Sequence, residues 1–106
     1  MTATGEQLDT TIERMRRVYR IKLRDKAVEL KGAVVRLQRD PSTRGDLFKL
    51  LRQLAGTAGS YGLAEVSARA DIVRSDIKGK RPMQVSLEVT PLINMLLRIS
   101  ARASRG

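Results

Sequence analysis

Apolar residues recur at helical spacing along most of the chain and predict four amphipathic helices. In the first, at about residues 10–38, they advance by three or four positions and form one continuous stripe of Met15, Val18, Tyr19, Leu23, Ala27, Leu30, Val34 and Leu37. This spacing places all of them on one face of a helix. Pro41 ends the helix because proline disfavours a helical residue before it and has no amide hydrogen. Asp40 or Ser42 is suited to capping the helix that follows.

The second helix is predicted to end near Ser60 or Tyr61, with Tyr61 packed at the junction to the next helix. The third presents an apolar stripe of Leu63, Val66, Ala70, Val73 and Ile77. It ends at Gly79, with Pro82 beyond, which is the usual order of residues at a helix stop.

The fourth helix is predicted to begin at Pro91, because Thr90 is a good cap and proline suits the first helical position. Its buried edge comprises Leu92, Leu96, Ile99 and Ala103. Residues 83–89 are predicted to form a loop or an irregular lead-in, with an earlier start of the helix or an extended segment as the alternatives. Four amphipathic stripes with short connections indicate an all-α, antiparallel up-down four-helix bundle. We expect one domain over residues 1–106, with an ordered core at about 10–103.

The second helix has two sides of different character. At 100° per residue, its leucines lie on one side with Ala58, whereas Arg52, Gly56 and Gly59 lie on the other. Each glycine inside a helix costs roughly 0.5–1 kcal/mol relative to alanine. Glycines placed away from the core therefore suggest a surface that another molecule approaches closely. The candidate partner-binding residues are Phe48, Lys49, Arg52, Gln53, Ala55, Gly56 and Gly59.

The amino-acid composition argues against several kinds of catalytic and metal-binding site. The chain has neither cysteine nor histidine among its 106 residues, so it lacks the commonest general base and the commonest transition-metal ligands. We expect no enzymatic activity, no cofactor and no metal site. No apolar run approaches the roughly 18 residues of a membrane span, and no secretory pattern is visible. We therefore expect a cytoplasmic protein without a membrane span.

The stretch Arg52-Gln53-Leu54-Ala55-Gly56 resembles the signature helix of bacterial histidine-phosphotransfer (HPt) domains. That signature reads His-x-Leu-Lys-Gly, and a second glycine follows six positions later, as Gly62 does here. The resemblance covers roughly residues 19–77. It implies a four-helix bundle whose glycine-bared helix docks on a receiver domain or a histidine kinase.

The phosphoacceptor histidine of the family falls on Arg52, and its accompanying lysine falls on Ala55. A guanidinium stays protonated and offers no nucleophilic nitrogen. We therefore expect a degenerate family member that cannot carry phosphate. It would dock on a receiver or kinase as a competitor, adaptor or inhibitor. The alternative is that Arg52 is one solvated arginine among many and that the glycines ease packing with another helix.

A basic cluster in the first helix supports a different function. The net charge is +10, and seven cations lie within thirteen positions: Arg14, Arg16, Arg17, Arg20, Lys22, Arg24 and Lys26. Such a cluster suits a phosphate backbone or an anionic membrane surface. A basic helical nucleic-acid-binding protein is the alternative function. An ordinary solvated helix face would look the same. A third hypothesis is a structural dimerisation domain that uses the long first helix.

Overall fold

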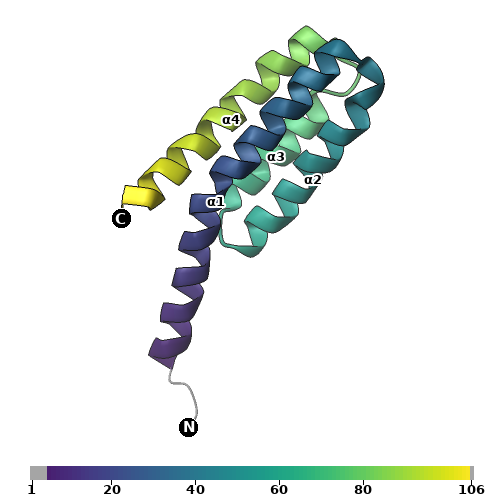
Figure 1. The fold of residues 1–106 in the computed structure, drawn as a ribbon. Helices are drawn as coiled ribbons and strands as arrows, with labels where there is room; N and C mark the ends of the chain where they lie inside the picture. The colour runs from purple at the N-terminus through teal and green to yellow at the C-terminus, as the bar shows by residue number, and fades with distance from the viewer. Residues whose placement is uncertain (1–4, 106) are drawn as a thin grey trace.

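A computed structural model describes the backbone of residues 5–105 and the side chains of residues 8–105. The regular elements in this range are helical, which confirms the all-α four-helix bundle (Figure 1). They are α1 (Gly5–Arg39), the short 3-10 helix η1 (Pro41–Thr43), α2 (Arg44–Ser60), α3 (Ala64–Asp76) and α4 (Pro82–Arg105).

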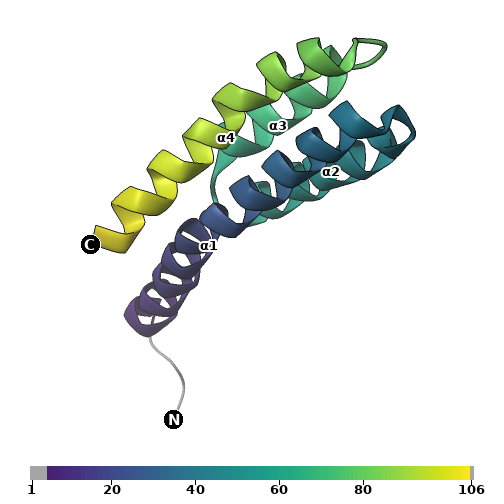
Figure 2. The same ribbon diagram turned by 45° about the horizontal axis from the view of Figure 1, so that its top comes forward.

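The four helices form a ring in which each contacts its neighbours in the chain and α4 closes against α1. The most extensive packing joins α1 to α4 and α2 to α3. Figure 2 shows the bundle from a second side, with α1 in front of α2 and α4 in front of α3. Hydrogen bonds set the register of α1 against α4. The Ser100 hydroxyl donates to the Ile21 carbonyl at 2.6 Å, and the Gln38 amide donates to the Pro82 carbonyl at 2.6 Å. Rising residue numbers on α1 thus face falling numbers on α4, so this pair is antiparallel.

The core consists of the apolar stripes that the helical spacing predicts. Leu23, Leu30 and Leu37 of α1 are buried. The other helices contribute Leu47, Leu51, Leu54 and Ala58 from α2, Val66, Ala70 and Val73 from α3, Ile77 after it, and Leu92 and Leu96 from α4. Burying each leucine or valine removes enough apolar surface from water to contribute about 1.5–3 kcal/mol. These side chains set the rotation of every helix about its own axis.

The beginning of α1 differs from the prediction. The helix starts at Gly5, and Met15 and Val18 keep 52% and 44% of their surface exposed. They do not belong to the buried stripe. The first turns of α1 extend beyond the other three helices (Figure 1). Met15 and Val18 lie where the bundle ends and line an open hollow with Tyr61, so the described chain covers them only in part.

The prediction for α4 was wrong. Residues 83–89 are helical, α4 begins at Pro82, and Pro91 lies inside the helix. Val85 and Val89 are fully buried, and burial of two valines outweighs the hydrogen bond that Pro91 cannot donate. The Thr90 hydroxyl donates to the Ser86 carbonyl at 2.7 Å, so Thr90 lies within the helix and does not cap it.

The cap that precedes α2 also differs in detail. The Asp40 carboxylate accepts from the Ser42 amide at 3.0 Å and from the Ser42 hydroxyl at 2.7 Å. These hydrogen bonds lower the pKa of Asp40. They cap η1, whereas the N-terminus of α2 at Thr43 has no side-chain cap. Asp40 therefore organises the turn that leads into α2.

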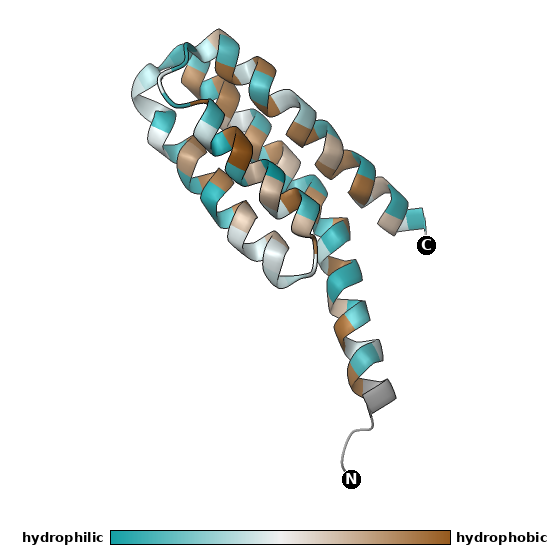
Figure 3. Ribbon diagram, turned by 180° about the vertical axis from the view of Figure 1, so that it is seen from behind, coloured by the Kyte–Doolittle hydropathy of each residue, from teal (hydrophilic) through white to brown (hydrophobic). Residues whose placement is uncertain are grey.

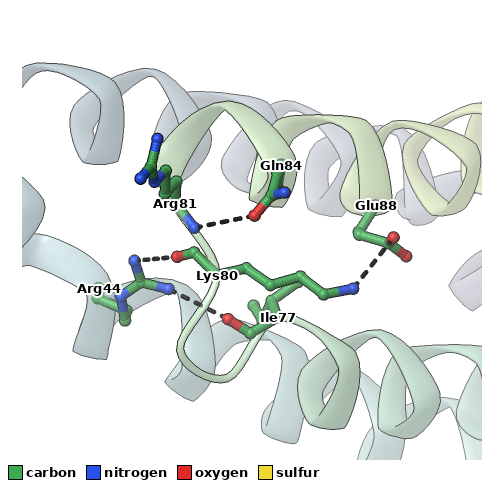
Figure 4. Close-up of polar contacts among 6 residues, drawn as sticks. All are labelled: Arg44, Ile77, Lys80, Arg81, Gln84 and Glu88. Atoms are coloured by element: carbon green, nitrogen blue, oxygen red, sulfur yellow. Dashed lines mark hydrogen bonds and ion pairs between the residues drawn. The ribbon is translucent and has the colours of Figure 1, made fainter.

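Arg44, the first residue of α2, fastens that end of the bundle (Figure 4). Its guanidinium donates to the Ile77 carbonyl at 3.2 Å and to the Lys80 carbonyl at 2.6 Å. The Lys80 ammonium in turn lies 3.3 Å from the Glu88 carboxylate on α4. The connection between α3 and α4 is thus tied to both α2 and α4, so the ends of three helices are held together.

The internal proline of α4 leads to a stability prediction. Replacing Pro91 by alanine restores an amide that can donate to the Leu87 carbonyl, and alanine is the better helix former. We expect Pro91→Ala to raise the free energy of unfolding by about 1–2 kcal/mol, measured by urea denaturation. Asn94→Ala is the control, because it changes helix propensity alone. A Pro91→Ala gain no larger than the control's would contradict this account.

Candidate docking surface on the second helix

The outward side of α2 carries a shallow, open hollow. It is lined by Lys49, Arg52, Gln53, Gly56, Thr57, Ser60 and Tyr61. Four of these belong to the predicted partner-binding set: Lys49, Arg52, Gln53 and Gly56. Ser60 was not predicted, although it lies four positions after Gly56 and so on the same side of the helix. The helical-wheel position alone could have found it.

Gly56 is the feature of this surface that internal packing does not explain. Apart from its own helix backbone and its two chain neighbours, a Cβ atom added there would meet no heavy atom of the described residues within 4 Å. The helix therefore has room for alanine at this position, and alanine would stabilise it by roughly 0.5–1 kcal/mol. The bare backbone leaves a place where another molecule could lie directly against α2.

Gly59 lies nearer to α3 than Gly56 does. Its Cβ position lies 3.4 Å from the Ser67 hydroxyl of α3, which is ordinary contact. The same hydroxyl donates to the Ala55 carbonyl at 2.6 Å. A side chain at Gly59 would thus contact α3, whereas one at Gly56 would not.

Two further members of the predicted set turn inward. Ala55 is only 7% exposed and belongs to the core, and Phe48 is partly buried against it. A partner cannot reach the Ala55 side chain, so Ala55 is removed from the docking surface. The physical reason is its angle, because a residue at the edge of the apolar side is covered when α3 packs close.

Gly62 has a local explanation in the turn after α2. Its φ of +80° is a conformation that side chains rarely adopt. The Leu63 amide donates to the Ala58 carbonyl at 2.9 Å and the Gly62 amide to the Gly59 carbonyl at 3.1 Å, which is the Schellman pattern of a helix end. Leu54 is a core residue. Of the three residues that match the HPt signature, only Gly56 therefore lacks a structural role in this chain.

The two cations of the hollow have no partner of their own. Arg52 and Lys49 are exposed, and within the part of the chain that the structure describes neither makes a hydrogen bond or an ion pair. They lie three positions apart and project from one side of α2. A guanidinium presents parallel N–H groups that match a carboxylate or phosphate. In the hollow, the helix backbone at Gly56 carries no side chain, and the unpaired cations of Arg52 and Lys49 lie beside it.

Tyr61 closes one end of the hollow. As predicted, it packs at the helix junction, where its ring stacks on Tyr19 of α1 with centroids 4.4 Å apart and planes 7° apart. Tyr19 is 8% exposed, and its hydroxyl has no hydrogen-bond partner among the described residues. Burial, followed by the effect of Tyr61, raises the pKa of the Tyr19 phenol above 10.0.

The basic residues of α1 do not share one face. The Arg17 guanidinium donates to the Ala103 carbonyl of α4 at 3.3 Å, and Arg20 pairs with Glu13 at 3.2 Å. Lys26 pairs with Glu29 at 3.7 Å, and Arg16 lies against Gly62. The others are Arg14 and Lys22, which flank an apolar hollow beside Tyr61, and the exposed Arg24. The seven cations are therefore distributed around the helix.

Residues 8–105 contain no group of carboxylates that could hold a metal ion. Among the described helices, none is both long and apolar enough to cross a bilayer. Comparisons of the chain with protein-family models, with curated proteins and with solved structures returned no match.

The two glycines of the signature are expected to respond oppositely to alanine. Gly56→Ala should raise the free energy of unfolding by about 0.5–1 kcal/mol, because the site is open. Gly62→Ala should lower it by about 1–2 kcal/mol, because the left-handed conformation disfavours a side chain. Chemical denaturation measures both changes. Destabilisation by Gly56→Ala would show that the protein itself needs this glycine.

The unpartnered Tyr19 hydroxyl leads to a pH prediction. Tyr19→Phe loses no hydrogen bond, so its stability near neutral pH should match or slightly exceed that of the wild type. Because the folded pKa is raised, the unfolded chain releases this proton first, and stability falls as pH rises past 10.0. Tyr19→Phe should lose less stability than the wild type over that alkaline range, measured by denaturation at several pH values. Equal losses would contradict the assignment.

Proposed function

We propose that this chain is a non-catalytic, HPt-like signalling module that docks on a receiver domain or a histidine kinase without carrying phosphate. It acts as a competitor, adaptor or inhibitor in a phosphorelay. The observation that carries the proposal is Gly56, an interior helix glycine with open space in front of it and no role in the packing of the chain. A glycine that costs stability and serves no internal contact is accounted for by an external one.

The position of the cations fits such a contact. Arg52 precedes Gly56 by four positions, so its side chain rises beside the bared backbone on the same side of α2. Lys49 extends the positive field along the rim. The HPt resemblance implies a partner whose phosphorylation pocket gathers carboxylates. An exposed guanidinium complements such a pocket and speeds encounter in a salt-dependent way.

The same surface argues against phosphoryl transfer. The residue beside the bared backbone is Arg52, and the chain has no histidine elsewhere. A guanidinium remains protonated at any working pH and has no free lone pair for a phosphoryl group. The module would therefore occupy the partner's site without accepting its phosphate.

Nucleic-acid binding is less well supported. A phosphate-backbone footprint needs cations on a common face, whereas the seven of α1 are distributed around the helix and several are engaged within the protein. Arg52 and Lys49 alone would contact only a short stretch of a phosphate backbone. Binding of nucleic acid is therefore one of the outcomes that the binding test below distinguishes.

The test is binding to a panel of purified receiver and kinase domains. Arg52→Asp should weaken binding at least tenfold, about 1.4 kcal/mol, because it reverses the charge facing an acidic pocket. Gly56→Leu should weaken it as much by filling the space that the partner needs. The matched controls are Arg24→Asp, an exposed arginine of α1, and Gly45→Leu, an α2 glycine that is also open but lies outside the hollow.

If both variants bind like the wild type while a receiver or kinase is bound, the proposed surface is wrong. If no domain binds and duplex DNA binds at low salt with a steep salt dependence, the nucleic-acid function replaces the proposal. Incubation with a phosphorylated receiver is expected to leave this chain unlabelled. Transfer of label to it would contradict the non-catalytic role.

A further inference from the structure

The N-terminal turns of α1 expose an apolar stripe where the helix projects beyond the bundle (Figure 3). Leu8, Ile12 and Met15 are 54%, 45% and 52% exposed. They are spaced by four and then three positions, and the next residue in the series is Tyr19, which enters the core. The stripe therefore continues the buried stripe of α1 into a region where the described chain offers nothing to cover it.

We propose that a second copy of this chain covers the stripe by pairing the N-terminal part of its own α1 in the antiparallel direction. Spacings of four, three and four are those of a coiled-coil seam. Pairing Ile12 with the second copy's Met15 also brings Leu8 level with its Tyr19, whose ring is covered by Tyr61, so that Leu8 meets the hollow beside that ring. The same contacts then occur twice about a two-fold axis, which makes the interface self-complementary.

The charge pattern of α1 selects the antiparallel direction. The first thirteen residues hold three acidic residues and no basic one, whereas residues 14–26 hold seven basic residues and one acidic residue. Antiparallel pairing sets the acidic segment of each copy against the basic segment of the other. Parallel pairing sets like charges together. In a heptad that places Leu8 and Met15 at d and Ile12 at a, Asp9 and Arg16 occupy the e positions. The e positions of two antiparallel helices face each other.

Each copy has a hollow that fits the N-terminal end of α1 from the second copy. A hollow with apolar walls, beside the stacked tyrosines, is lined by Arg14, Met15, Val18, Tyr19, Lys22 and Tyr61. In the antiparallel register the second copy's Leu8 comes level with Tyr19, beside this hollow. Its Asp9 then comes near Arg16, which makes no hydrogen bond of its own among the described residues. The apolar contact of Leu8 and the charge pair of Asp9 with Arg16 thus both occur in the same antiparallel register.

The size of the contact predicts a weak association. Residues 8–19 of each copy span about 18 Å of helix at about 1.5 Å per residue. One pair of helices of that length buries less than the roughly 1,000 Å² of a stable interface. The dimer is therefore concentration-dependent. It uses a different surface from Arg52 and Gly56, so it stands or falls independently of the proposed function.

The test is sedimentation velocity at increasing protein concentration. The wild type should shift toward twice the monomer mass. Asp9→Lys and Arg16→Glu should each abolish the shift, because each places like charges opposite one another twice. An equal mixture of the two variants should recover it, since each variant restores opposite charges across the other. Arg24→Glu, which makes the same charge change on the outer side of α1, should dimerise like the wild type.

Helical content measured by circular dichroism shows whether each variant remains folded, and Ile12→Asp supplies a second disruption that does not depend on the charge pair. A wild type that stays monomeric at every concentration overturns the proposal. So does a mixture that fails to associate, or a loss of association in Arg24→Glu as large as in Arg16→Glu. Binding of the wild type to anionic vesicles without self-association would assign the stripe to a membrane surface and likewise overturn it.

Discussion

Burial of the leucine side of α2 is the constraint on which the candidate site depends. Leu47, Leu51 and Leu54 are at most 3% exposed. Because successive residues turn by 100°, their burial compels Arg52 and Gly56 to face outward. Arg44 ties the start of α2 to the turn before α4, and the Schellman turn at Gly62 ends it. The outward surface is therefore held on a helix whose rotation cannot change without exposing the core.

The fold could be predicted where spacing alone decides it. The stripes of α2 and α3 lie in the core because amphipathic helices of a small bundle have one way to bury them. The start of α4 was predicted wrongly, since local rules favour Pro91 as a helix start, whereas the burial of Val85 and Val89 stabilises a helix that begins at Pro82.

In the candidate site, too, some features follow from the spacing of residues along the helix and others depend on the packing between helices. The outward direction of Arg52 and Gly56 follows from the position of the leucines along α2. The burial of Ala55 depends on how closely α3 approaches, which no local pattern records. The spread of the α1 cations likewise depends on contacts with Glu13 and with the end of α4.

The two proposed surfaces differ in what supports them. On α2 the support is a glycine that no internal contact requires, beside cations without partners. On α1 it is an apolar stripe whose flanking charges change sign along the helix. Tyr61 borders both hollows, and its stack on Tyr19 joins α1 to the end of α2.

The most direct test of the central claim is to map the contact by nuclear magnetic resonance. Isotope-labelled protein is titrated with a receiver or kinase domain that binds it, and the backbone amide shifts are followed. The account predicts that the largest changes lie on the outward side of α2, at Lys49, Arg52, Gly56 and Ser60. Changes concentrated on α1 or α4, with the amide of Gly56 unmoved, would contradict it.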